Sequence, residues 1–147
     1  MHIHSPIKQK DIFTRAIVLL FSPVKVFHYY TDGEDICDEC RMPIALPWVY
    51  YSTITSIAYF LAGCAIGIGM SCMPFLKALT AVILMGIFHH IYSSVIFAVF
   101  PWEAYNPDIR SAKAWREDAN KELAKKTRSI ILGMLFGVFL YVALIME

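Results

Sequence analysis

The sequence predicts an all-α integral membrane protein with three transmembrane helices, an interfacial amphipathic helix before them and a long cytoplasmic helix running into the third. Three observations support this fold class. Hydrophobic residues make up 58% of the chain and charged residues 17%, against roughly 45–50% and about 25% in soluble domains. Two apolar runs reach the length of about 20 residues that a bilayer crossing needs. A third apolar run follows a charged segment with no helix breaker.

These features divide the chain of 147 residues into three segments. Residues 1–46 form an N-terminal cytoplasmic or interfacial segment with an acidic CxxC loop. Residues 47–100 form a transmembrane helical hairpin. Residues 101–147 combine the charged cytoplasmic helix with the third transmembrane helix.

The first predicted element is the run Ile12–Phe21. It is too short to cross a bilayer, and Arg15 interrupts it. We interpret it as an amphipathic helix in the membrane interface. The side chains expected to face lipid or a partner are Ile12, Phe13, Ala16, Ile17 and Leu20. Residues 31–41, which follow an aromatic cluster, are expected to form an acidic loop.

The hairpin begins with the uncharged run Pro47–Met70. Trp48, Tyr50 and Tyr51 stand at its start, where we expect amphipathic rings to lie at headgroup depth. A very short turn then leads into the second span, residues 75–100. A turn of this length requires the first two spans to be antiparallel.

The third segment opens with Trp102 and Tyr105, again expected at interface depth. Asn106, Pro107 and Asp108 then suit a helix N-cap and first turn. Nothing breaks this helix before Ser129, so we expect it to continue directly into the third span, Ile130–Met146. That span is at the lower length limit of about 17 residues. The alternative is a half-inserted C-terminal anchor.

The basic residues predict the orientation. Twelve of the thirteen lie before the first span or between the second and third spans, and the remaining one, Lys77, lies at the edge of the hairpin turn. The positive-inside rule therefore places the N-terminus in the cytoplasm and the C-terminus on the opposite side. The expected location is the plasma or cell inner membrane, or its organellar equivalent.

His89 and His90 lie near the centre of the second span. Ionisable residues at this depth are costly and often mark functional sites. Either ring could ligate haem or a chlorophyll-type pigment, relay protons or contact a quinone. The structural alternative is a neutral histidine hydrogen-bonded to a neighbouring helix. We expect His90 to point at protein, because it shares a small polar helix face with Gly86, Ser93 and Ser94.

Cys37 and Cys40 form a CxxC pair in the acidic loop. This spacing is half of a structural zinc site, which needs four ligands. His28, the terminal His2 and His4, or a second subunit could complete it. The alternative is a pair of ordinary loop cysteines, and Cys64 and Cys72 are expected to be packing residues.

Small residues predict where helices meet. The GxxxG spacing, which permits close helix approach, occurs twice. It is formed by Gly63 and Gly67 in the first span and by Gly133 and Gly137 in the third. Ser52 and Ser56 extend the first of these faces. The pattern does not decide whether the contact is within the chain or with another protein.

The sequence favours a non-catalytic role. It has no Walker loop, HExxH, GxSxG or dinucleotide-binding motif, and no carboxylate inside a predicted span. The basic stretch 110–128 alternates with acids, so no nucleic-acid surface is expected. Our first hypothesis is an accessory or assembly subunit of a larger membrane complex, with helix 107–128 and the CxxC loop as docking elements and with homo-oligomerisation as an option. The alternatives are a cofactor-binding redox or light-harvesting subunit, and a small exclusion, immunity or regulatory membrane protein.

Overall fold

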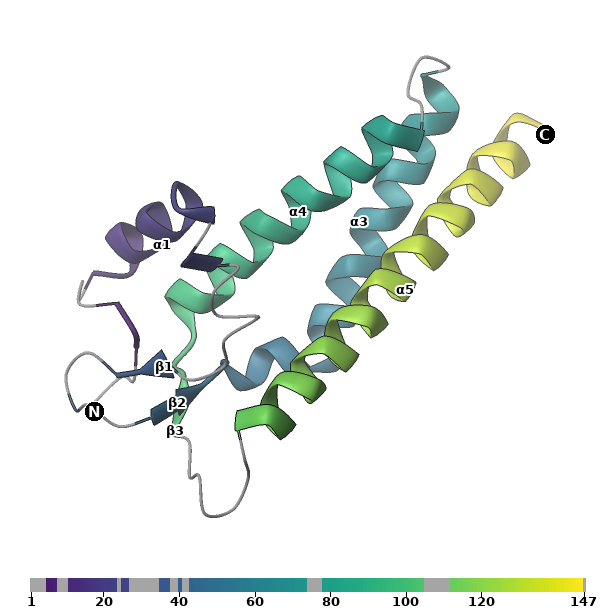
Figure 1. Cartoon of the computed structure of the whole chain (residues 1–147). Helices are drawn as coiled ribbons and strands as arrows, with labels where there is room; N and C mark the ends of the chain where they lie inside the picture. Colours follow the sequence, from purple (N-terminus) through teal and green to yellow (C-terminus); the bar gives the residue numbers. More distant parts are fainter. Residues whose placement is uncertain are drawn as a thin grey trace. The chain divides into compact units, whose positions relative to one another are not determined.

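The computed structural model describes residues 5–7, 11–23, 25–26, 35–37, 40, 43–73, 78–104 and 112–146. This part of the chain is mostly helical (Figure 1). Its elements, in chain order, are the helix α1 (Ile12–Leu20), the strands β1 (Asp35–Ile36) and β2 (Pro43–Ala45), the 3-10 helix η1 (Trp48–Tyr51), the helices α3 (Thr53–Cys72) and α4 (Ala78–Val99), the strand β3 (Glu103–Ala104) and the helix α5 (Ala112–Ile145).

Three of these helices are long and apolar enough to cross a membrane. They are α3, α4 and the stretch Glu117–Ile145 of α5. In the most apolar window of each, only 22%, 28% and 17% of the residues are buried inside the protein. Most residues in these windows are therefore at least partly exposed, as expected of helices that contact lipid or other membrane proteins. The fold is compatible with an integral membrane protein.

The first span starts later than the sequence suggested. The chain forms the 3-10 turn η1 before α3 begins at Thr53, with Ser52 at the N-cap. The reason is local packing, because Tyr50 is buried against Phe97, with ring centroids 6.3 Å apart. Trp102 is buried as well, and only Trp48 of these three rings is exposed. Residues 74–77, at the predicted start of the second span, lie outside the described residues.

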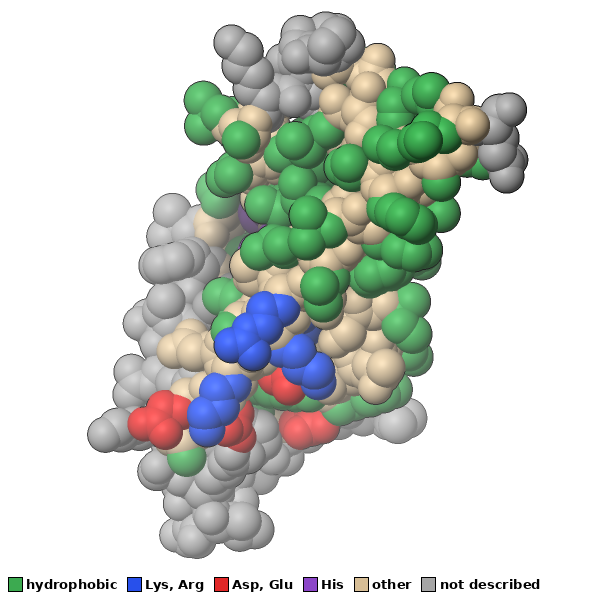
Figure 2. Space-filling model, turned by 90° about the vertical axis from the view of Figure 1, so that its right-hand side faces the viewer, with side chains coloured by type: hydrophobic (Ala, Val, Ile, Leu, Met, Phe, Trp, Pro, Cys, Tyr) green, Lys and Arg blue, Asp and Glu red, His purple; other side chains and the backbone are tan. Residues whose placement is uncertain are grey.

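The predicted continuity of the third segment is confirmed. The helix α5 runs without a break for 34 residues, a length of about 51 Å. Its first half carries the charges between Glu117 and Arg128, and its second half is apolar. Figure 2 shows the charged side chains gathered in one part of the viewed face and hydrophobic side chains over much of the rest. Residues 105–111, including the predicted helix start, lie outside the described residues.

The chain forms two compact units. The first comprises Met1–Tyr51 and His90–Glu122, and the second comprises Ser52–His89 and Leu123–Glu147. The helices α4 and α5 each contribute one part to both units.

The first unit has a hydrophobic core built around a small antiparallel sheet. The strand order is β1-β2-β3, and Ile44 of β2 pairs with Asp35 on one side and Ala104 on the other. The expected acidic loop therefore contains part of a sheet. Strands of two or three residues have no periodicity that a sequence can show. Buried side chains of the core include Leu19, Cys37, Ile44, Val49, Tyr50, Phe97 and Trp102.

The second unit is held together by close contact between α3 and α5. Side chains built on Gly63 and Gly67 would collide with the carbonyl oxygens of Ile130 and Met134. The contact is reciprocal, because Gly133 and Gly137 face the carbonyl oxygens of Phe60 and Cys64 in the same way. Residue numbers rise together along both helices, so α3 and α5 are parallel. The two predicted GxxxG faces therefore pack on each other within the chain.

Candidate functional site

His89 makes a hydrogen bond between two helices of the second unit. Its Nδ1 lies 2.5 Å from the hydroxyl oxygen of Tyr59, which is on α3 and is almost fully buried. The Tyr59 ring also makes an edge-on contact with Phe88, at a centroid distance of 5.1 Å. The bond provides a polar partner for both groups inside an otherwise apolar helix pair. Interhelical bonds of this kind contribute about 0.6 kcal/mol on average and up to about 1.7 kcal/mol.

His90 makes its contact within the first unit. Its Nε2 lies 2.8 Å from the carbonyl oxygen of Leu20, the last residue of α1. A carbonyl can only accept a hydrogen bond, so Nε2 carries the proton and donates it. The last carbonyls of a helix have no partner within the helix. His90 therefore caps the C-terminus of α1 and attaches this helix to α4.

The small polar face of α4 points at protein only in part. Ser93 and Ser94 are buried, and the Ser94 hydroxyl donates to the His90 carbonyl oxygen at 2.8 Å. Gly86 makes no such contact within this chain. It is exposed, and a side chain built on it would meet nothing within 4 Å. The contact with α1 is made one helical turn further on, at His90.

Both histidines are thus hydrogen-bonded to another helix, which is the alternative to cofactor binding. Their rings bond to different helices, His89 in the second unit and His90 in the first. Haem or pigment ligation by either ring stays a prediction. Tyr59 is the residue that sequence reasoning missed. The predicted hairpin contained a signal for this contact. Tyr59 lies fourteen residues before Met73, and His89 lies twelve residues after Lys77. In an antiparallel hairpin, residues at similar distances from the turn lie opposite each other.

The CxxC pair lies at the sheet of the first unit. Cys37 directly follows β1 and is fully buried in the core, and Cys40 is half-buried. Neither forms a disulfide. Across the described residues, no group of three or more His, Cys, Asp or Glu side chains is arranged to hold a metal ion. His28, His2 and His4 lie outside the described residues, so zinc binding by Cys37, Cys40 and His28 stays a prediction.

The outward face of α4 in the second unit is the candidate partner-binding site. We define this α4 face as Leu79, Val82, Ile83, Gly86 and Ile87, which recur at helical spacing. The four apolar side chains are between 50% and 72% exposed. Gly86 interrupts them with an open notch. Such a surface fits the ridge of another helix, because a glycine allows backbones to approach closely.

Comparison with known proteins does not assign this site. No family model matches the chain, and no match was found among curated proteins or solved structures.

Proposed function

We propose that this chain is a non-catalytic accessory subunit of a larger membrane complex, which binds a transmembrane helix of another protein through the α4 face. The observation that carries the proposal is the position of Gly86. Gly63, Gly67, Gly133 and Gly137 all face the backbone of a neighbouring helix, whereas Gly86 faces open space. The proposal assigns Gly86 the same role toward a partner.

The energetics support a partner at this position. A glycine inside a helix is less favourable than alanine by roughly 0.5–1 kcal/mol. At Gly63 and its three packed counterparts, close helix contact offsets this cost. At Gly86 the isolated chain makes no such contact. The binding of a partner helix supplies one.

The side chains beside Gly86 also suit a helix interface. Val82, Ile83 and Ile87 are β-branched, so their χ1 angles are restricted in a helix before any partner arrives. Packing against them costs little side-chain entropy. In a bilayer, helix association depends on such van der Waals packing rather than on removal of apolar surface from water. The α4 face combines stiff ridges with a central notch.

The orientation and location follow from the basic residues. In this proposal the N-terminus and the charged half of α5 face the cytoplasm, and the C-terminus faces the opposite side. The exposed charged residues Glu117, Lys121, Lys125 and Arg128 then extend a docking surface outside the bilayer.

The test is purification from native membranes in mild detergent. We expect the chain to elute in a stoichiometric complex with another membrane protein. Gly86→Leu fills the notch and is expected to remove that partner. Ala65→Leu is the matched control, because it enlarges an exposed small residue on α3. Elution as a monomer, or a complex that tolerates Gly86→Leu, contradicts the proposal. A complex containing only differently tagged copies of this chain replaces it with self-assembly.

A further inference from the structure

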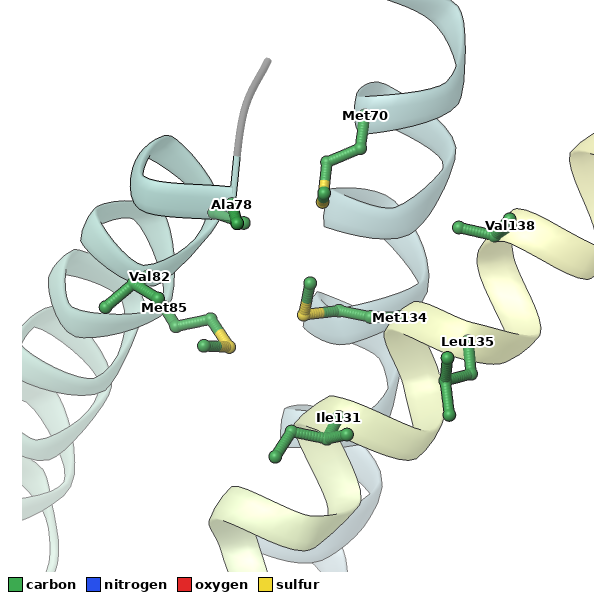
Figure 3. Close-up of a pocket in the computed structure, with 9 residues that line it drawn as sticks. Met70, Ala78, Val82, Met85, Ile131, Met134, Leu135 and Val138 are labelled. Carbon is green, nitrogen blue, oxygen red and sulfur yellow. The ribbon is translucent and has the colours of Figure 1, made fainter.

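Three methionine side chains, one from each long helix, point into the same pocket of the second unit. Met70 belongs to the end of α3, Met85 to α4 and Met134 to α5. Figure 3 shows their thioether groups turned toward a common space between the helices. The pocket has a volume of about 280 Å³. Its other lining residues are all apolar: Ala78, Ala81, Val82, Ile131, Leu135 and Val138.

The pocket exists because α4 presents small side chains there. Ala78 and Ala81 leave space that a leucine would fill, and Met134 sits between the packed glycines Gly133 and Gly137. Methionine has three rotatable side-chain bonds and a polarizable sulfur. The three side chains can therefore change the positions of their sulfur atoms within the pocket by rotamer changes.

Thioether sulfur is a soft, neutral ligand. It selects soft cations such as Cu(I), whereas hard cations prefer oxygen ligands. We propose that Met70, Met85 and Met134 form a three-thioether site for a soft monovalent cation, Cu(I). The ion binds and leaves without a change in oxidation state. Binding is reversible coordination by the three sulfur atoms and involves no proton transfer.

The helix ends do not decide the charge of the occupant. Met70 lies two residues before the C-terminal end of α3, where the partial charge is negative, but Ala78 at the N-terminal end of α4 lines the same pocket and has the opposite sign nearby. Met134 lies eleven residues before the end of α5, beyond the reach of that helix terminus. The preference for a soft cation therefore rests on the three thioether groups.

A small apolar molecule is the competing occupant. An apolar cavity of about 150 Å³ is enough to bind benzene, and this pocket is larger. The convergence of one sulfur from each of three helices favours the cation, since an apolar guest needs no such arrangement. The two occupants give different results in the experiment below.

The experiment titrates the full chain in detergent with Ag(I), a redox-inert substitute for Cu(I), and with buffered Cu(I). The four cysteines are replaced by alanine and His2 and His4 by glutamine to remove stronger ligands. We expect one bound ion per chain. Met85→Leu, which conserves volume, is expected to weaken binding at least tenfold. Met146→Leu is the matched control, because Met146 is exposed at the C-terminus.

A second readout does not depend on the cysteine substitutions. In the unmodified chain with ¹³C-methyl methionine, excess Ag(I) is expected to shift the methyl signals of Met70, Met85 and Met134 together. No binding, binding that survives Met85→Leu, or a shift confined to other methionines overturns the proposal. Displacement of these signals by an apolar probe such as xenon, but not by Ag(I), assigns the pocket to an apolar guest instead.

Discussion

His89 and His90 are neighbours in sequence, yet they stabilise different contacts. The first bonds to Tyr59 on α3, and the second bonds to the end of α1. Adjacent residues on a helix are rotated by about 100° from each other, so they face different neighbours. This explains why two costly polar side chains occur together inside an apolar span. Each makes a hydrogen bond to a group on a different helix.

The Tyr59–His89 bond can be tested with a conservative change. Tyr59→Phe keeps the ring and removes the hydroxyl, and we expect it to lower the free energy of unfolding by about 0.6–1.7 kcal/mol. The measurement is reversible unfolding in mixed micelles with increasing SDS. Tyr141→Phe is the control, because the same group is removed from a half-buried tyrosine on α5. Equal losses in both variants contradict the assigned bond.

Asp11 shows a similar capping role at the start of α1. Its carboxylate accepts hydrogen bonds from the Thr14 backbone N–H at 2.8 Å and from the Thr14 hydroxyl at 2.9 Å. These bonds, the backbone bond first, hold the pKa of Asp11 below its ordinary value of 3.8. A lowered pKa means that the ionised form stabilises α1. That contribution is complete above pH 3.8 and disappears as the pH falls through the lower folded value.

The corresponding measurement is an NMR titration of the Asp11 side-chain carbonyl carbon in detergent. We expect it to titrate below the value found in the denatured chain. Thr14→Ala removes the hydroxyl bond but keeps the backbone bond, so it should raise the pKa only part of the way. A native titration at or above the denatured value contradicts the cap.

At the scale of the elements, the contact between α3 and α5 depends on glycine. Gly63→Leu places a side chain against the Ile130 carbonyl. Overpacking typically costs about 1–3 kcal/mol, so we expect Gly63→Leu to lower the stability of the isolated chain by at least this much. Gly86→Leu is the matched control, since it enters open space and should leave that stability unchanged or slightly higher. SDS unfolding of both purified variants measures the difference, and equal losses contradict the packing.

The sequence predicted the long helices well because their signals extend over many residues. The uninterrupted run from Ala112 to Ile145 and both GxxxG faces could be read directly. The small sheet could not, because β3 joins residues near position 103 to a partner near position 44. Such a pairing depends on tertiary contacts that no local pattern records. For the same reason the sequence predicted rings at headgroup depth at Tyr50 and Trp102 without indicating that both pack in the core of the first unit.

The candidate sites show the same limit. The polar character of the centre of α4 was evident from His89 and His90, but their partners required the structure. The GxxxG motifs indicated helix contacts without indicating which helices. With these motifs paired within the chain, Gly86 is a described glycine that faces open space, which is the basis of the proposed partner contact. Lys126 is a further example, because it is fully buried although it lies in a segment expected to be solvated or bound to a partner.

At the scale of the whole molecule, the account depends on three bilayer crossings. Three helices have the length and hydropathy for this, and few of the residues in their apolar windows are buried. If all three cross, the turn after α3 and the charged half of α5 must lie on opposite sides of the membrane. In the proposed orientation, the charged half of α5 lies in the cytoplasm.

Cysteine labelling in intact cells tests this claim most directly. One variant keeps only the native Cys72, which is exposed at the end of α3. Two further variants have a single thiol on either side of the apolar half of α5, at the exposed positions Lys121→Cys and Met146→Cys. We predict that a membrane-impermeant maleimide labels Cys72 and the thiol at position 146 in intact cells, and labels the thiol at position 121 only after permeabilisation. Labelling of position 121 from the same side as either of the other two thiols contradicts the three-span account.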